Sequence, residues 1–351
     1  MGETGDSARD SVRVVITSPL EDDLIQAIAA TDPRLDVVYE RDLVPIPRYP
    51  ADHALPLIAA PRDRARWERL LEEAEVLFDF GPRDLTERLP SWPRLRWIQA
   101  TSAGVGQFAA RTGLTRSPII ITTASGVHAR PLAEFVLMAM LMFEKGAFRL
   151  FADQRERRWE RYAGGEIAGK VVGVVGVGRI GREVARVTRA LDARAIGVAR
   201  ALDGRRAADL GMDALFPVEH IDDVLPTVDY LVLCLPHTAD TDQLLSAARL
   251  ALLKPAAVLI NVARGAVMDE EALIAMLQSG RLRGAALDVF AREPLPPESP
   301  LWGLPNVLIS PHSASTAGNE NQKIVGLFRE NLRRYLDGQP LRNVLDKRLL
   351  Y

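Results

Sequence analysis

The chain has 351 residues, enough for two ordinary domains that each bury a core. Its hydrophobic fraction of 48%, its charged fraction of 26% and its formal net charge of -2 fit a globular protein and exclude the overall basic surface of a nucleic-acid-binding protein. The single cysteine, Cys234, excludes an intramolecular disulfide, and with no apolar signal segment or bilayer-length apolar run we expect a cytoplasmic protein without membrane contact.

The first third of the chain predicts a layered domain of strands and helices. Short β-branched runs alternate with amphipathic stretches from Val12 onward, which is typical of a largely parallel sheet. A proline-rich segment, Arg41–Pro61, is long for a connection in a compact domain and suggests a function that the sequence does not specify. The expected strands are Val12–Thr17, Leu35–Tyr39, Val76–Phe80, Leu95–Gln99 and Ile119–Thr122.

A second series of strands follows a predicted buried helix over Pro131–Phe143, which has proline in its first turn. These strands are apolar at consecutive positions, as parallel strands covered on both faces require. The last predicted helix, Gln322–Leu336, is followed by Gly338 as a stop signal. The expected strands are Val171–Val175, Ala195–Val198, Tyr230–Leu235, Val258–Val262, Ala285–Phe290 and Val307–Ser310.

A glycine pattern, G-x-G-x-x-G, lies between the strand Val171–Val175 and a helical stretch. Gly176, Gly178 and Gly181 would allow a tight turn, close approach to a pyrophosphate and close packing of helix on strand. The helix N-terminus would offer free N–H groups to the anion. We therefore predict a dinucleotide site here, with Arg179 and Ile180 beside it.

The residues about twenty positions beyond the glycines favour NADP over NAD. An acidic residue that would bind the ribose of NAD is missing at the expected strand end, where Ala199 and Arg200 stand. A small residue beside an arginine leaves room for a 2'-phosphate and offers it a guanidinium. Arg205 and Arg206 follow. The alternatives are that Arg200 stacks on adenine and both cofactors bind, or that Asp203 reaches the ribose.

Three further segments carry candidate chemistry, and each follows an expected strand. They contain Arg264, then Asp288 and Glu293, and finally His312. Because ligands of open α/β sheets bind beyond the carboxyl ends of the strands, these side chains are expected at one edge of the sheet. Taken singly, each has a structural alternative. Arg264 could form a surface ion pair, and Asp288 could cap local backbone N–H groups. Glu293 could be a solvated loop residue, and His312 could be a turn histidine.

The other histidines predict no metal site. His53, His128, His220 and His237 lack metal-ligand spacing with one another and with Cys234. Cys234 lies in a short apolar run and is expected to be a buried strand residue instead of a nucleophile.

From about Thr101 onward the chain resembles the D-isomer-specific 2-hydroxyacid dehydrogenase family. The resemblance lies in the glycine fingerprint and in the segments N-V-A-R-G, D-V-F-x-x-E-P-L-P and P-H-x-A-S. It implies that Arg264 binds the substrate carboxylate and polarises its carbonyl, that His312 exchanges a proton and that Glu293 hydrogen-bonds the imidazole. It also implies substrate-carboxylate binding by Ser102, Ala103 and Gly104, and cofactor contacts by Pro236, Thr238, Ala263 and Asp288.

The resemblance implies an α/β fold of two Rossmann-like, doubly wound parallel-sheet domains. A dinucleotide-binding domain, residues 123–312, is expected within a split flavodoxin-like substrate domain, residues 1–122 and 313–351, with the active site in the cleft between them. A homodimer is expected through Pro131–Phe143 and Phe151–Tyr162.

The implied activity is hydride transfer between NAD(P)H and a small 2-oxo acid, of glyoxylate or hydroxypyruvate reductase type. The alternatives are a formate- or phosphite-oxidising relative and, in another class, a nucleotide-sensing scaffold or corepressor. The sequence does not specify the substrate side chain, whose selection is expected near Phe80–Arg83 and Arg41–Pro61.

Overall fold

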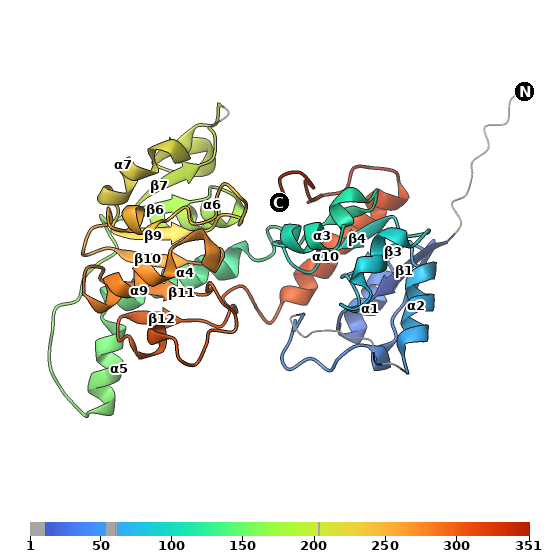
Figure 1. Ribbon diagram of the computed structural model, residues 1–351, viewed down its shortest axis with the longest axis horizontal. Coiled ribbons are helices and arrows are strands. Elements are labelled where there is room, and N and C mark those ends of the chain that lie inside the picture. The colour runs from blue at the N-terminus through green and yellow to red at the C-terminus, as the bar shows by residue number, and fades with distance from the viewer. Residues whose placement is uncertain (1–10, 54–59, 61, 203) are drawn as a thin grey trace, which may run out of the picture. The chain divides into compact units, whose positions relative to one another are not determined.

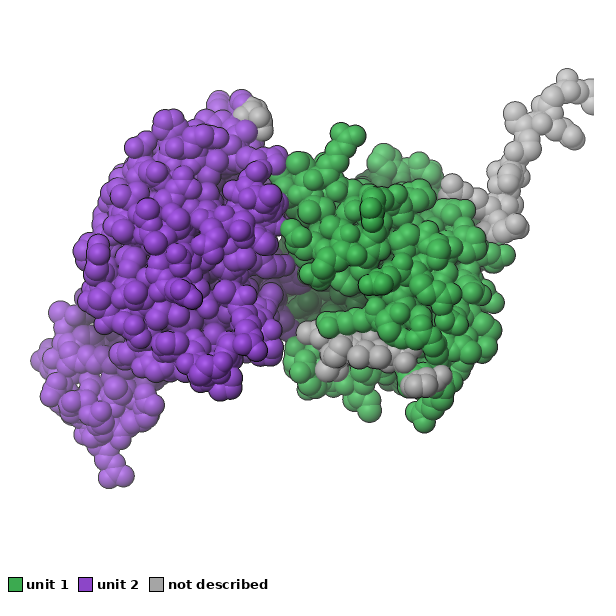
Figure 2. Space-filling model, viewed as in Figure 1, with its two compact units in different colours: residues 1–127, 317–351 green, residues 128–316 purple. Residues whose placement is uncertain are grey.

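This computed structural model describes residues 11–53, 60, 62–202 and 204–351, so the polar stretch Met1–Asp10 lies outside the described residues. The chain divides into two compact units, coloured green and purple in Figure 2. Unit 1 consists of Met1–Val127 and Ala317–Tyr351, and unit 2 of His128–Thr316. Both units are α/β with parallel sheets, as the sequence predicts.

Unit 1 is built on a five-stranded parallel sheet of order β2-β1-β3-β4-β5. This is the flavodoxin-like order, in which the direction of winding reverses between β1 and β3. Figure 1 labels the strands β1, β3 and β4 of this sheet. The strands are β1 (Val12–Ile16), β2 (Leu35–Val38), β3 (Val76–Phe78), β4 (Trp97–Gln99) and β5 (Ile120–Thr122). The helices are α1 (Asp22–Ala29), α2 (Arg64–Glu73), α3 (Gly106–Arg111) and α10 (Glu320–Leu336).

Both faces of this sheet are buried, which explains the consecutive apolar residues of its strands. On one face, Val15, Leu77 and Ile98 share a core with residues of α2 and α3. On the other face, α10 inserts Phe328, whose ring lies 5.1 Å from that of Phe78. A helix from the C-terminal part of the chain therefore completes the core of the N-terminal part.

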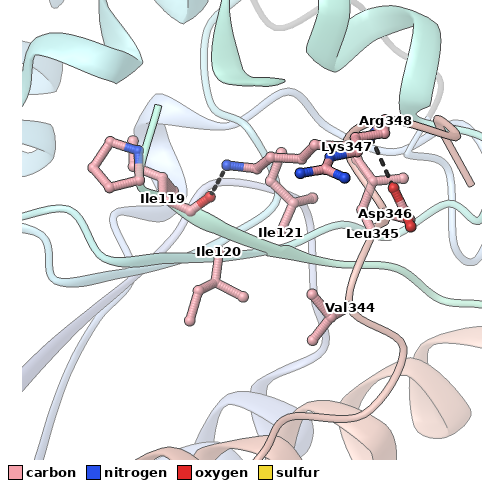
Figure 3. Close-up of a pocket in the computed structure, with 9 residues that line it drawn as sticks. Ile119, Ile120, Ile121, Val344, Leu345, Asp346, Lys347 and Arg348 are labelled. Carbon is pink, nitrogen blue, oxygen red and sulfur yellow. Dashed lines mark hydrogen bonds between the residues drawn. The ribbon is translucent and has the colours of Figure 1, made fainter. Parts of the chain in front are cut away.

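The segment after α10 covers the edge strand β5. The Leu345 N–H donates to the Ile121 carbonyl at 2.8 Å, and the ammonium of Lys347 donates to the carbonyl oxygens of Ser117 and Ile119, both at 2.6 Å. Figure 3 shows Lys347 reaching along β5 beside a cavity of about 380 Å³. The segment occupies a sheet edge that would otherwise expose unpaired backbone groups.

Unit 2 is built on a seven-stranded parallel sheet of order β12-β11-β10-β9-β6-β7-β8, which reverses between β6 and β9. The strands are β6 (Val171–Val175), β7 (Arg194–Ala199), β8 (Ala214–Pro217), β9 (Tyr230–Leu233), β10 (Val258–Asn261), β11 (Gly284–Leu287) and β12 (Val307–Ile309). The helices are α4 (Ala129–Glu144), α5 (Ala147–Arg155), α6 (Arg179–Arg189), α7 (Ile221–Val224), α8 (Ala247–Leu250) and α9 (Glu270–Gln278).

Several strand bounds differ from the expected ones. The predicted strand Tyr230–Leu235 ends at Leu233, and Ala285–Phe290 is shifted to Gly284–Leu287. Apolar residues beyond these strands, such as Phe290 at 5% exposure, are buried in loops, so their hydrophobicity does not signal strand structure. The half-buried strand β8 was not predicted.

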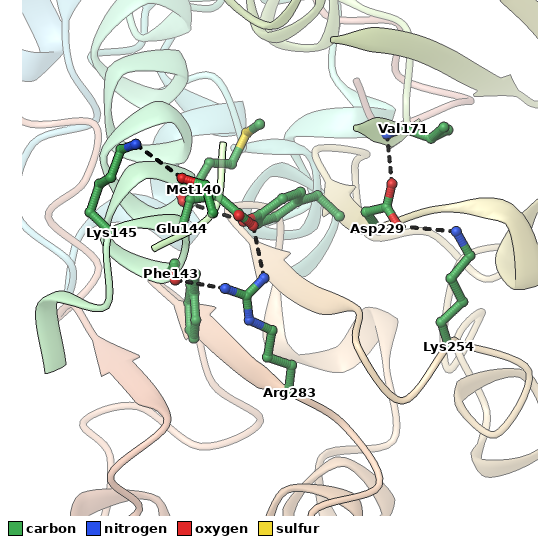
Figure 4. Close-up of polar contacts among 10 residues, drawn as sticks. Met140, Phe143, Glu144, Lys145, Val171, Asp229, Lys254 and Arg283 are labelled. Carbon is green, nitrogen blue, oxygen red and sulfur yellow. Dashed lines mark hydrogen bonds and ion pairs between the residues drawn. The ribbon is translucent and has the colours of Figure 1, made fainter. Parts of the chain in front are cut away.

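The C-terminal end of α4 is fastened to the sheet by a buried polar network (Figure 4). Glu144 accepts hydrogen bonds from the Tyr230 hydroxyl at 2.5 Å and from Arg283 at 2.8 Å, and Arg283 also donates to the Phe143 carbonyl at 2.7 Å. Although α4 is strongly apolar, neither it nor any other helix in the described parts of the chain is long and apolar enough to span a bilayer.

Candidate active site

The three fingerprint glycines form the turn from β6 into α6, and at two of them a side chain would not fit. Gly176 has φ of 102°, and a Cβ there would lie 2.7 Å from the Cys234 carbonyl oxygen. At Gly181 a Cβ would lie 2.1 Å from the carbonyl oxygen of Gly176, whereas Gly178 has open space around it. The turn therefore exposes backbone at the N-terminus of α6, which suits the pyrophosphate of a dinucleotide.

The other cofactor candidates of unit 2 follow neighbouring strands. Arg179 and Ile180 begin α6, while Pro236 and Thr238 follow β9, the partner of β6 at the reversal of the sheet. Thr241 accepts from the Thr238 N–H at 2.8 Å and donates to the Pro236 carbonyl at 2.7 Å, which holds this turn in shape. Ala263, 4% exposed, follows β10.

Arg200 stands where the sequence places it, directly after β7, and is exposed. Arg206 is held by Asp209 through two hydrogen bonds of 3.0 and 2.9 Å, and Arg205 donates to the Leu202 carbonyl at 3.2 Å. Of the three predicted arginines, Arg200 is thus the one at the strand end. Asp203, the acidic alternative, lies outside the described residues.

His312 and Glu293 form a hydrogen-bonded pair in unit 2. The Nδ1 of His312 lies 2.8 Å from one Glu293 oxygen, and the other oxygen accepts from the Phe290 N–H at 3.0 Å. Burial alone would raise the pKa of Glu293, but these hydrogen bonds and the positive charges of His312 and Arg264 outweigh it and hold the pKa below its usual value. Within the described residues, Nε2 of His312 has no hydrogen-bond partner, and the side chain is 43% exposed.

Arg264 follows β10 as a half-buried cation. Its guanidinium donates to the Ala263 carbonyl at 2.6 Å and forms no ion pair with any carboxylate of the described residues. Burial lowers the pKa of Arg264, partly offset by the charges of Glu293 and Asp288. A guanidinium has five N–H donors in a planar fork, so most of them remain available to a carboxylate.

Asp288 is almost fully buried, and its carboxylate organises the segment that carries His312. One oxygen accepts from the Ser310 hydroxyl at 2.6 Å and from the N–H groups of Ser313 and Ala314, both at 2.9 Å. Asp288 therefore caps local backbone N–H groups, which is the structural alternative that the sequence allows for it. The second oxygen has no hydrogen-bond partner among the described residues and is available to a ligand.

Two residues of unit 2 were missed as site residues. Ser310 donates to Asp288, and Asn261, fully buried at the end of β10, accepts from the Ala263 N–H at 3.0 Å and donates to the Arg264 carbonyl at 3.1 Å. Asn261 thereby shapes the turn that presents Arg264. A polar asparagine at the end of an otherwise apolar strand is the sequence feature by which Asn261 could have been identified.

Cys234, His237 and His220 show no catalytic arrangement. Burial raises the pKa of Cys234 to about 12, as expected for a structural thiol. His237 is paired with Asp242 at 2.8 Å and His220 with Asp223 at 3.1 Å. The described residues contain no cluster of histidine, cysteine and carboxylate side chains that could hold a metal ion.

In unit 1, Ser102, Ala103 and Gly104 lie in the loop between β4 and α3, where Ser102 accepts from the Gly104 N–H at 3.3 Å. Ser102 and Gly104 line a cavity of about 270 Å³ that the carboxyl ends of β1, β3 and β4 surround. Asp79 and His53, for which the sequence predicts no role in a site, also line this cavity.

Comparison with known proteins agrees with this architecture. The family model described as D-isomer specific 2-hydroxyacid dehydrogenase, NAD binding domain, matches residues 137–314. A glyoxylate/hydroxypyruvate reductase B of Pectobacterium atrosepticum is 32% identical over 287 residues, which cover 80% of this chain and 88% of that protein. A D-3-phosphoglycerate dehydrogenase of Mycobacterium tuberculosis is 32% identical over 79% of this chain, which spans 52% of that longer protein.

A solved structure extends the likeness to nearly the whole chain. The D-isomer specific 2-hydroxyacid dehydrogenase of Xanthobacter autotrophicus, in complex with NADPH and MES, has a TM-score of 0.77 and 31% identity and covers 97% of this chain and 100% of that one. The sheet orders, the glycine turn and these matches lead to one conclusion: the chain belongs to the D-isomer specific 2-hydroxyacid dehydrogenase family of NAD(P)-dependent enzymes.

Proposed function

We propose that this enzyme reduces a small 2-oxo acid of the glyoxylate or hydroxypyruvate type to the D-2-hydroxy acid, with NADPH as the favoured cofactor. The pairing of His312 with Glu293 carries the proposal, because it holds one imidazole nitrogen and leaves Nε2 without a partner among the described residues. The likeness to a glyoxylate/hydroxypyruvate reductase at 32% identity supports the substrate class.

Reduction of a 2-oxo acid adds a hydride to carbon and a proton to oxygen. When bound, the reduced nicotinamide supplies the hydride. His312 donates the proton from Nε2, and the carboxylate of Glu293 accepts from Nδ1 and orients the ring. Positioned acid catalysis of this kind contributes about 100- to 10,000-fold to the rate.

Arg264 is proposed to bind the substrate carboxylate and to polarise the neighbouring carbonyl. Its guanidinium is half-buried and lacks a carboxylate partner within the described residues, so an incoming anion would gain charge-assisted hydrogen bonds. In unit 1, the loop Ser102–Gly104 is proposed to offer backbone N–H groups to a carboxylate.

NADPH is favoured because Arg200 stands at the end of β7, the position from which a side chain reaches the adenosine ribose. The glycine turn is proposed to bind the pyrophosphate, with Arg179, Ile180, Pro236, Thr238 and Ala263 around it. The second oxygen of Asp288 is proposed to accept from the nicotinamide carboxamide. The NADPH complex of the Xanthobacter relative supports this preference.

A homodimer is proposed through α4 and the segment around α5. Large apolar side chains of this region are exposed, among them Met138 at 43%, Phe151 at 52% and Trp159 at 96%. Exposed apolar side chains of this kind support an interface between two copies of the chain. Light scattering after gel filtration should give twice the mass of the chain for the native protein and a monomer for Trp159→Glu combined with Phe151→Glu; a native monomer would refute the proposal.

The activity is tested by following NADPH and NADH oxidation against glyoxylate, hydroxypyruvate, pyruvate and bulkier 2-oxo acids. Fast turnover with NADPH and one of the first two acids is expected. If every 2-oxo acid fails while NAD-dependent oxidation of formate or phosphite proceeds, the oxidising alternative is correct instead.

A further inference from the structure

The cavity of unit 1 lies at the reversal point of its sheet. Thr17 and Ser18 follow β1, whereas Asp79 and Phe80 follow β3, and these two strands are the neighbours between which the winding direction changes. Open α/β sheets bind ligands at the carboxyl ends of the strands at such a point. Nothing in the catalytic proposal above uses this cavity beyond Ser102 and Gly104.

Asp79 is held in an unusual backbone conformation at the mouth of β3. Its N–H still pairs with the Gln99 carbonyl at 2.8 Å, but its φ is 70°, in the left-handed region that few residues other than glycine adopt. Gly81, two residues later, also has a positive φ. This turn makes Asp79 part of the cavity wall instead of the sheet core.

The cavity combines this carboxyl group with hydroxyl groups and an apolar wall. Ser18 and Thr101 are buried beside Asp79, and Phe80 and Phe108, whose rings lie 4.6 Å apart, form the apolar wall. Burial raises the pKa of Asp79, and the neighbouring groups offset this rise only in part. A ligand group that can donate a hydrogen bond would compensate the desolvation of this carboxyl group.

A chain of hydrogen bonds behind the cavity determines the tautomer of His53. Asn321 donates through its amide nitrogen to the Glu21 carboxylate at 2.9 Å, so its oxygen must accept from Nε2 of His53 at 2.7 Å. The other ring nitrogen lies 2.6 Å from the Ser18 hydroxyl. With its proton on Nε2, His53 accepts at Nδ1 from the Ser18 hydroxyl.

The remaining charged groups of the cavity leave Asp79 as the principal acceptor. Asp52 is held by Arg48 through hydrogen bonds of 2.7 and 3.0 Å, and Arg83 is exposed at the rim. The Asp79 carboxyl group makes the interior unfavourable for a second carboxylate of a ligand, because the cost of bringing like charges together adds to that of burial.

We propose that this cavity binds the side chain of the 2-oxo acid and that Asp79 selects a side chain bearing a hydroxyl donor, as in hydroxypyruvate, over one that is apolar or acidic. The inference rests on the reductase function proposed above and specifies its substrate. Ser102 and Gly104 in the same cavity would hold the carboxylate end, and the hydrogen-bonded pair of Ser18 and His53 lines the wall beside Asp79.

The test compares kcat/KM for hydroxypyruvate, pyruvate and oxaloacetate, whose side chains carry a hydroxyl, a hydrogen and a carboxylate on the same carbon. The variants are Asp79→Asn and Asp79→Gly, since asparagine and glycine both tolerate a positive φ. Asp84→Asn is the control, because Asp84 lies outside the cavity and pairs with Arg64 at 2.7 Å. Thermal unfolding verifies that each variant is folded.

The native enzyme should prefer hydroxypyruvate over pyruvate by about tenfold or more, because a site that hydrogen-bonds a hydroxyl rejects the analogue lacking it. Asp79→Gly should abolish this preference, with pyruvate turnover within about threefold of native, and Asp79→Asn should be intermediate. Both variants should use oxaloacetate better than the native enzyme does. Opposite changes for the two polar substrates cannot arise from general damage to the fold.

An unchanged ratio of hydroxypyruvate to pyruvate in Asp79→Gly overturns the inference and leaves the reductase function in place. Equal kcat/KM values for hydroxypyruvate and pyruvate in the native enzyme also overturn the inference and leave the reductase function in place. Failure of the native enzyme with every 2-oxo acid overturns the proposed function and this inference with it.

Discussion

The backbone N–H of His312 donates a hydrogen bond of 2.9 Å to the carbonyl oxygen of Asp288. The side chain of Asp288 binds the next two N–H groups of the same segment, so this one residue determines the path of the chain on which His312 is presented. Removal of its carboxylate should therefore affect both stability and activity.

Asp288→Ala would leave the N–H groups of Ser313 and Ala314 without their acceptor. We expect the free energy of unfolding to fall by about 1–3 kcal/mol, the cost of unsatisfied partly buried donors, and turnover to be lost as His312 shifts. Urea denaturation and the absorbance assay measure the two effects. Ser310→Ala, which removes only the hydroxyl bond, should cost about 1 kcal/mol or less; equal losses in both variants would contradict this account.

His312→Asn should reduce kcat by about 100- to 10,000-fold, because asparagine cannot deliver the proton. Asparagine also tolerates the φ of 53° that His312 adopts, so the backbone should stay in place. Fluorescence titration should show unchanged NADPH binding. His220→Asn, at an exposed histidine, is the matched control and should keep native turnover. Near-native turnover of His312→Asn would exclude His312 as the proton donor.

Arg200→Ala tests the cofactor preference. Loss of a guanidinium that binds a 2'-phosphate should lower kcat/KM for NADPH by about 10- to 100-fold, the worth of hydrogen bonds to a charged group, with little change for NADH. Arg206→Ala should leave both values near native, because Asp209 already engages Arg206. An equal loss for both cofactors on Arg200→Ala would refute the assignment.

The stability of the enzyme should depend on the ionisation of Glu293. Because the pKa of Glu293 is lower in the folded than in the unfolded chain, the stabilisation is present above the ordinary glutamate pKa of about 4.3 and is lost as pH falls through the lower folded value. Melting temperatures of native protein and Glu293→Gln should therefore converge below pH 4 and differ most above about pH 5. A constant difference across this range would show that Glu293 does not contribute in this way.

The glycine turn and the catalytic segments could be predicted because the residues that each of them requires lie close together in the sequence. The strand Val171–Val175 has the predicted bounds, since Gly176 turns the chain sharply after it. Asp79 could not be recognised in the same way. It stands within an apolar run that predicts a strand through Phe80, and only the structure shows that β3 ends at Phe78 and that Asp79 adopts a positive φ.

The strand β8 was missed for a related reason. Its four residues are only half-buried, and it ends in a proline, so it has neither the continuous hydrophobicity of a central strand nor clear alternation. Contacts between distant segments, such as the bond of Asn321 to His53, leave no local pattern in the sequence.

The completion of unit 1 by α10 and by the segment after it, which contains Leu345 and Lys347, has a consequence for biosynthesis. During translation, β1 to β5 leave the ribosome early. The helix α10, whose Phe328 fills their core, is synthesised only after the whole of unit 2. Unit 2 is continuous and can fold as soon as it is released. The nascent sheet of unit 1 is thus the segment that a holding chaperone would protect during translation.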